Sequence, residues 1–149
     1  MDKAKFLFPT AYDTFALDML KQVKVKFDES AVTDIICGQA DGLTASLKPK
    51  LEGFEFDQKV KGFCSIVNER GYNIALRKLK DGYYMIKQQN CPVIAIATSY
   101  DQLCNEESGV YKELLEVEVV CESRIAAGAQ SCNYRVTPSG RADNYDTLL

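Results

Sequence analysis

The chain has 149 residues, of which 46% are hydrophobic, and it carries a formal net charge of −3. This length supports one ordinary hydrophobic core, so we expect a single domain. No stretch approaches the roughly 18 consecutive apolar residues of a transmembrane helix, and the start MDKAKFLFPTAYD lacks the apolar region of a secretory signal. We therefore predict a cytoplasmic protein with no membrane partner.

The six cysteines and the absence of histidine limit the possible chemistry. In a reducing cytoplasm, cysteines serve as buried thiols, metal ligands or redox groups more often than as structural disulfides. Without histidine the chain has no Ser-His-Asp or Cys-His constellation and no histidine-containing zinc site. A Gly-rich phosphate loop and a nucleophile elbow are also missing from the sequence. We therefore expect no enzymatic activity.

Charge is spread unevenly along the chain. Residues 91–149 carry 4 Lys and Arg against 9 Asp and Glu, and no basic stripe is visible anywhere. A protein that binds the phosphate backbone of nucleic acid needs such a basic surface. We therefore expect contact with DNA only through a separate domain.

The first half of the chain has the periodicity of helices. Apolar residues at three- and four-residue steps predict a helix over 12–27, a second over 30–49 that begins at a serine cap and stops at a proline, and a third over 57–71 that begins at an aspartate cap. Cys37 and Cys64 lie on the apolar faces of these helices, which indicates buried structural thiols.

The second half alternates strands with one helix. The dipeptide Asp81-Gly82 between two β-forming runs predicts a hairpin. A helix follows over 99–117, and two strands joined at Gly128 form a second hairpin. These elements predict an α+β domain over 1–137, with helices on one face of an antiparallel sheet of about four strands. The polar segment 138–149 is expected to be a flexible tail.

Four cysteines, Cys91, Cys104, Cys121 and Cys132, lie in this second half. Thiolates are the ligands that zinc and iron-sulfur clusters prefer, and four of them complete the shell of a cluster. Their spacing contains no Cys-x-x-Cys pair, so the spacing by itself is a weak signal. Metal ligands and small buried residues therefore both remain open for them.

Several short motifs are similar to the regulatory domain of DeoR-like winged-helix regulators, which include the SufR-type iron-sulfur-sensing repressors. They are FPTAYDTFALDML, ERGYNIALRK, NCPVIAIA, LCNEE and a glycine four residues before CNYRV, and they extend over about 6–137. The resemblance implies a dimeric sensor domain that holds an iron-sulfur cluster through Cys91, Cys104 and Cys132. Zinc is the alternative metal.

Two departures from this pattern affect its interpretation. The SufR-type pattern has its third cysteine near Val117, whereas this chain has Cys121, which is either a replacement ligand or an ordinary thiol beside a three-cysteine site. No winged helix precedes Phe8-Pro9, so DNA would be contacted through a separate domain. The apolar helix over 12–27 is then free to form a homodimer contact.

The segment VCESRIAAGAQSCNYRV is also similar to the end of four-vinyl-reductase-type ligand-binding domains. This likeness implies a module that binds a small-molecule effector in an apolar pocket, with cysteines that are structural or bind zinc. The aromatic residues that could line such a pocket, or pack in the core instead, are Phe54, Phe56, Tyr72, Tyr83, Tyr84 and Tyr134. A third possibility is an enzyme with Cys91 or Cys121 as nucleophile, although no histidine is present to activate either thiol.

Overall fold

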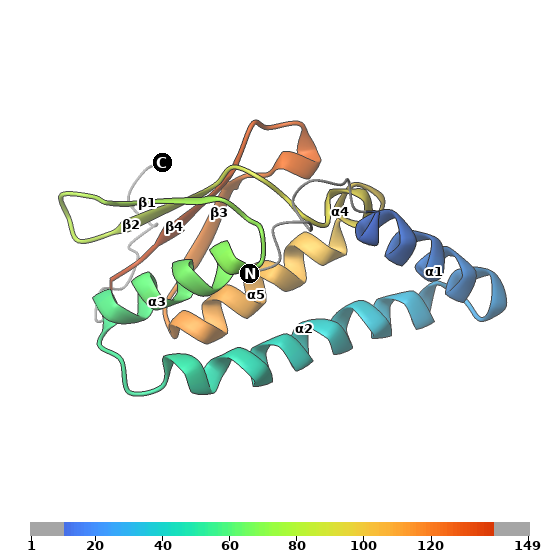
Figure 1. Cartoon of the computed structure of the whole chain (residues 1–149), viewed down its shortest axis with the longest axis horizontal. Helices are drawn as coiled ribbons and strands as arrows, with labels where there is room; N and C mark the ends of the chain where they lie inside the picture. Colours follow the sequence, from blue (N-terminus) through green and yellow to red (C-terminus); the bar gives the residue numbers. More distant parts are fainter. Residues whose placement is uncertain (1–10, 139–149) are drawn as a thin grey trace, which may run out of the picture.

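The computed structural model describes residues 11–138 (Figure 1). The α+β class predicted from the sequence is confirmed. In chain order the elements are α1 (Tyr12–Lys26), α2 (Glu29–Leu51), α3 (Phe56–Glu69), β1 (Ile74–Lys78), β2 (Tyr84–Gln88), α4 (Ile94–Ser99), α5 (Gln102–Leu115), β3 (Val119–Ser123), the 3-10 turn η2 (Ile125–Ala127) and β4 (Cys132–Val136). The predicted flexible tail lies, beyond Pro138, outside the described residues.

The four strands form one antiparallel sheet in the order β1-β2-β4-β3. Both predicted hairpins are present, and each supplies two neighbouring strands. Gly82 and Gly128 adopt φ angles of +84° and +98° in the two connections, a conformation that glycine takes without steric cost. Alternate residues of β2 and β4 are buried, and these side chains form the sheet face that the helices cover.

The helices form two layers beneath that face. α3 and α5 lie against the sheet, α2 lies on the far side of α5, and α1 turns back along α2 to meet α4 (Figure 1). The main hydrophobic core joins the sheet to α3, α5 and the second half of α2. A smaller separate cluster, centred on Leu20, Val32, Ile36 and Ile96, holds α1 and α4 against the first half of α2.

Two predicted helix boundaries are wrong, for identifiable reasons. α2 begins after Asp28 rather than at Ser30, because the Asp28 carboxylate accepts a hydrogen bond from the Ala31 N–H at 2.8 Å. The same helix continues past Pro49 to Leu51. A proline removes one backbone hydrogen bond, and here it does so in the last turn of the helix, where the chain is exposed on most sides.

The predicted cap of the third helix has another role. Asp57 lies in the first turn of α3, and its carboxylate accepts hydrogen bonds from Lys78 Nζ at 2.9 Å and from Tyr84 Oη at 2.8 Å. These bonds tie α3 to the hairpin and lower the pKa of Asp57. The short helix α4 (Ile94–Ser99) is not predicted from the sequence, which places only Ser99 in a helix, at the start of the one over 99–117.

The apolar face of α1 is only partly buried. Leu20 faces the core, but Phe15 is 65% exposed, Met19 is 55% exposed and Tyr12 is 80% exposed.

Within residues 11–138, none of the helices has the length and apolar character needed to cross a membrane.

Candidate ligand cavity and cysteine cluster

A cavity of about 590 Å³ lies where the five helices meet. Small-molecule sites in proteins commonly have volumes of roughly 300–1,000 Å³ and mostly apolar walls. The apolar lining comes from Phe15, Ala16, Met19, Leu20, Val23, Ile35, Ile36, Ala40, Leu43, Leu47, Phe63, Val67, Val93, Ile96, Leu103, Val110 and Leu114. In size and lining, the cavity therefore fits a small apolar molecule.

The spacing of side chains on α2 creates this space. Ile36, Ala40, Leu43 and Leu47 recur at three- and four-residue steps, so they share the face of α2 that packs against α5. Ala40 is the smallest of the four and is 5% exposed. Because its side chain is a single methyl group, the two helices enclose a space that a larger residue would fill.

One charged residue interrupts the facing row on α5. Leu103, Glu107, Val110 and Leu114 follow the same spacing and all line the cavity. Glu107 therefore occupies a position where the pattern favours an apolar residue. Glu107 is not among the residues predicted from the sequence, although a glutamate in the apolar row of a helix is a visible signal.

Hydrogen bonds fix the Glu107 carboxylate inside the cavity. Tyr111 Oη donates to Glu107 Oε1 at 2.6 Å, and Tyr72 Oη lies 3.4 Å from Oε2. Gln88 Nε2 in turn donates to Tyr111 Oη at 2.6 Å. Tyr111 and Gln88 are buried at the junction of α5 and the sheet, so the network connects the cavity to the main core.

Burial controls the ionisation of this network. The pKa of Glu107 is raised above its usual range, mainly because burial disfavours the carboxylate, although the hydrogen bonds from Tyr111, Tyr72 and Gln88 lower it. The pKa values of Tyr72 and Tyr111 are also raised, first by burial and then by the charge of Glu107. The cavity therefore holds a carboxyl group that ionises with difficulty.

A Glu107→Gln substitution should change how stability depends on pH. When folding raises the pKa of a carboxyl group, its protonated form stabilises the folded state at pH values below the unfolded-state pKa of about 4.3. This stabilisation is lost as the pH rises through the folded-state pKa. We expect the thermal midpoint of the variant to match the wild type near pH 4 and to exceed it increasingly towards pH 8. Glu113→Gln, the same change on the exposed face of α5, is the control. A Glu107→Gln effect that does not vary with pH would contradict this account.

The four predicted cysteines lie around one end of α5. Cys104 is in the first turn of α5, Cys91 precedes α4, and Cys121 and Cys132 project from β3 and β4 on the helix-facing side of the sheet. Cys132 Sγ accepts a hydrogen bond from the backbone N–H of Ile125 at 3.2 Å. The fold therefore brings together thiols from segments that are far apart in sequence.

The thiols also affect one another's ionisation. The pKa of Cys91 rises to about 11, chiefly through burial and also through the charges of Glu107, Cys132 and Cys104. Burial likewise raises the pKa of Cys104 and of Cys132, and each of these thiols interacts with Cys121. Each ionised thiol thus disfavours ionisation of the others.

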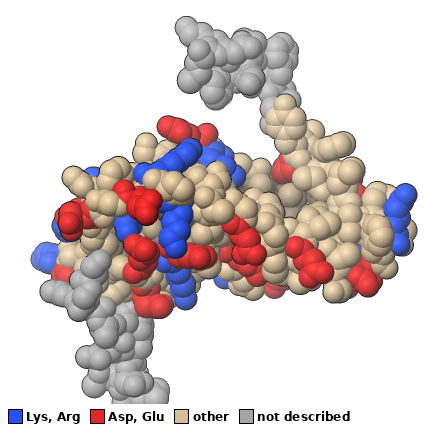
Figure 2. All heavy atoms as spheres, turned by 90° about the horizontal axis from the view of Figure 1, so that it is seen from below, with Lys and Arg blue, Asp and Glu red and all other residues tan. Residues whose placement is uncertain are grey.

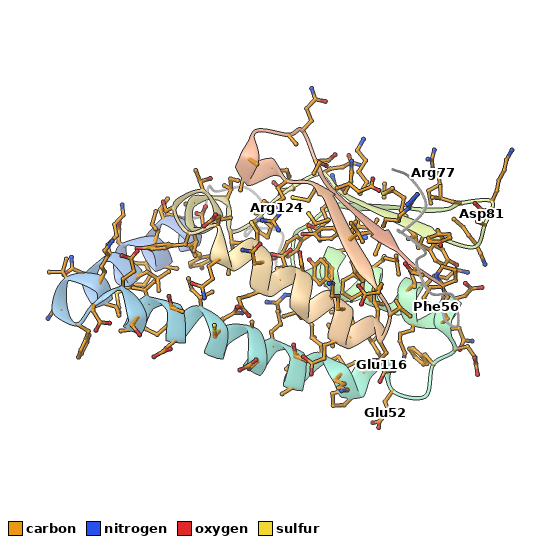
Figure 3. The ribbon with its side chains drawn as sticks, turned by 180° about the vertical axis from the view of Figure 1, so that it is seen from behind. Glu52, Phe56, Arg77, Asp81, Glu116 and Arg124 are labelled. Atoms are coloured by element: carbon orange, nitrogen blue, oxygen red, sulfur yellow. The ribbon has the colours of Figure 1, made fainter. Side chains whose placement is uncertain are left out.

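One cation lies beside the cluster. Arg124, labelled in Figure 3, extends from the turn after β3 towards α5, where Nη2 donates to Asn105 Oδ1 at 2.9 Å. A hydrogen bond with Cys121 is the main cause of its raised pKa. Its positive charge lowers the pKa values of Cys104 and Cys132, against the larger effect of burial.

Among residues 11–138, however, no three His, Cys, Asp or Glu side chains are arranged to hold a metal ion. The donor atoms suit a soft metal, but their present arrangement does not form a coordination shell.

The other sequence-predicted residues lie elsewhere. Cys64 is 6% exposed within the main core, as expected, and burial raises its pKa to about 12. Cys37 faces α5 rather than a core, and its Sγ donates to Glu106 Oε1 at 3.4 Å. Of the six aromatic residues for which the sequence left a pocket or the core open, only Tyr72 lines the cavity. Tyr84 and Tyr134 are core residues instead, because they point from β2 and β4 into the packed sheet face.

Comparison with known proteins identifies no relative of this chain: no protein-family model, curated protein or solved structure matches it. The resemblance to regulatory domains of winged-helix repressors stays a prediction.

Proposed function

We propose that this chain is a sensor module that binds an apolar small-molecule effector in the cavity between its helices. The observation that carries the proposal is the apolar cavity of about 590 Å³ with one fixed carboxylate in its wall. A large apolar pocket with a few convergent polar groups is the arrangement by which proteins bind small molecules. The regulator-like motifs support a role in transcription regulation in the cytoplasm, with DNA contacted through a separate winged-helix domain.

The division of the core supports a sensing role. α1 is held by the smaller cluster around Leu20 and Ile36, whereas α5 belongs to the main core. Side chains of both clusters line the cavity. A ligand that contacts both sides can therefore shift the position of α1 relative to the rest of the domain, provided that it binds the two arrangements with different affinity.

Titration with the neutral fluorescent probe N-phenyl-1-naphthylamine tests this function. We expect a saturable rise in fluorescence with one site per chain, together with a higher thermal midpoint, because a ligand that binds only the folded state stabilises it. The substitutions Cys91→Ser and Cys104→Ser should leave both effects in place. A signal that never saturates, or that appears only when the protein unfolds, would refute a defined cavity site.

The convergence of four thiols favours a second candidate function, the binding of an iron-sulfur cluster or zinc. Cys91, Cys104 and Cys132 would be the ligands, and Cys121 would be the fourth. Because the present arrangement of side chains forms no coordination shell, this candidate requires the thiols to reorient. The positions of the thiols, in the first turn of α5, before α4 and on the helix-facing side of β3 and β4, support it.

Anaerobic reconstitution with iron and sulfide tests the second candidate. Visible absorption and iron and sulfide content should show a cluster that is lost in Cys91→Ser, Cys104→Ser and Cys132→Ser. Cys37→Ser, a thiol on α2 outside the group of four, should have no effect. Loss in Cys121→Ser would indicate four ligands, and its retention would indicate three. If the wild type takes up neither iron nor zinc, the second candidate fails.

The proposal includes a homodimer formed through α1. Phe15 and Met19 are exposed on this helix, whose first half carries Asp13 and Asp18 and whose second half carries basic residues at 21, 24 and 26. An antiparallel pair of α1 helices would place the acidic half of each against the basic half of the other. Light scattering at micromolar concentration should give the mass of a dimer, and Met19→Lys should give a monomer. A monomeric wild type would remove this part of the proposal.

A further inference from the structure

The charged groups of the cavity are mostly acidic. Glu106 and Glu107 line it from α5, and among residues 11–138 Arg70 is the only Lys or Arg in its wall. Arg70 lies in the exposed turn after α3, so its charge is screened by solvent. Figure 2 shows that the face seen from below has charged side chains of both signs crowded at one end, with separate acidic groups along the rest of the face and a basic group at the opposite end. The polar character of the cavity therefore depends mainly on its two carboxylates.

Glu107 has no cationic partner in the part of the chain that the structure describes. The ion pairs within residues 11–138 involve other carboxylates, and no Lys or Arg nitrogen lies within 4.0 Å of Glu107. Arg70 acts on Glu107 only at longer range, and its effect on the Glu107 pKa is smaller than those of burial and of the hydrogen bonds. Its hydrogen-bond donors Tyr72 and Tyr111 are neutral, and so is Gln88, which donates to Tyr111 Oη.

An unpaired carboxylate in an apolar cavity is unfavourable, because burial removes water that no cation replaces. Hydrogen bonds from two tyrosines hold its oxygens in place even without a ligand, so the position of the negative charge is fixed in advance. The rings of Tyr72 and Tyr111 also line the cavity beside it, and aromatic faces attract cations. Each of these features favours a positively charged group on the ligand.

We propose that the ligand class of this cavity is the apolar organic amines, with the ligand ammonium paired to the Glu107 carboxylate and its hydrocarbon part between α2 and α5. This inference rests on the proposed small-molecule function and makes it specific. A cation beside Glu107 favours the ionised carboxylate and reverses the effect of burial. The apolar part of the amine is held by the same walls that would hold a neutral ligand.

Three ligands with the same eight-carbon chain test the head group directly: octylamine, 1-octanol and octanoate. Displacement of N-phenyl-1-naphthylamine from the 149-residue chain at pH 7 gives the three affinities. We expect octylamine to bind at least tenfold more tightly than 1-octanol, and octanoate to bind most weakly. In Glu107→Gln, octylamine should lose at least tenfold in affinity, while 1-octanol should change less than threefold. Glu113→Gln should leave all three affinities unchanged.

The outcomes separate the two proposals. If the probe binds but octylamine binds no better than 1-octanol, or octanoate binds most tightly, the amine inference is overturned and the small-molecule function stands. If the probe itself finds no site, the proposed function fails and the inference fails with it. If Glu107→Gln does not fold, the comparison of the three ligands on the wild type still tests whether the cavity prefers an amine head group, because that comparison requires no variant.

Discussion

Replacing Ala40 by Phe is expected to weaken binding of the neutral probe by at least 100-fold without unfolding the protein. Ala40 is 5% exposed and lies in the row of α2 residues that faces α5 across the cavity. The added ring would occupy space that the ligand needs. A cavity of about 590 Å³ can accept a phenyl ring without the strain that overpacking causes in a filled core. The thermal midpoint should therefore be unchanged or raised, since the ring buries apolar surface.

Ala45→Phe provides the matched control. Ala45 is on the same helix but is exposed and does not line the main cavity. This variant should bind the probe as the wild type does. Equal binding by Ala40→Phe and the wild type would show that the probe lies somewhere other than the cavity.

Phe63→Ala is expected to lower the free energy of unfolding by about 3–5 kcal/mol, the usual cost of deleting a buried phenyl ring. Phe63 is 1% exposed on α3, and its ring packs edge-on against Tyr111 with centroids 4.7 Å apart. It therefore joins α3 to α5 beneath the sheet. The loss should appear as a lower midpoint of urea unfolding with an unchanged m value.

Phe27→Ala tests whether this loss is specific to the core. Phe27 follows α1 and is 75% exposed, so its truncation should change the free energy of unfolding by no more than about 0.5 kcal/mol. If both variants lowered the free energy of unfolding by a similar amount, the distinction between a packed core around Phe63 and an exposed region around α1 would be wrong.

Much of the fold followed from local patterns in the sequence. The helix from Tyr12, the turn at Asp81-Gly82 and the strand pair around Gly128 each have a signal within a few residues. The errors arose where two local signals competed. Asp28 and Ser30 are both good caps, and which of them caps the helix depends on where the preceding loop leaves α1. The six residues of α4 are too few for a clear helical period.

The cavity could not be predicted in the same way. Its volume depends on the distance between α2 and α5, which is a property of tertiary packing. The sequence left open whether the aromatic residues line a pocket or pack in the core, and strand residues such as Tyr84 and Tyr134 point into the packed core. In contrast, Glu107 was visible in principle, because it interrupts an apolar row on a predicted helix.

The four cysteines of the second half converge in the fold, although the sequence gives little sign of it. Their spacing along the chain carries little information, and motif resemblance alone selected three of them. The fold nevertheless brings Cys91, Cys104, Cys121 and Cys132 together, because two project from neighbouring strands and two from the segments around α4. Whether they bind a metal is decided by reconstitution.

The central claim, that an apolar molecule binds between α2 and α5, is tested most directly by methyl NMR of the protein titrated with the neutral probe N-phenyl-1-naphthylamine. We expect the methyl resonances of Leu43, Val110 and Leu114, which line the cavity, to shift and saturate with one ligand per chain. The methyl groups of Ile86 and Val136 lie in the sheet side of the core, outside the cavity, and should stay in place. Shifts confined to the exposed residues of α1, or an absence of saturable shifts at the cavity methyl groups, would contradict the account.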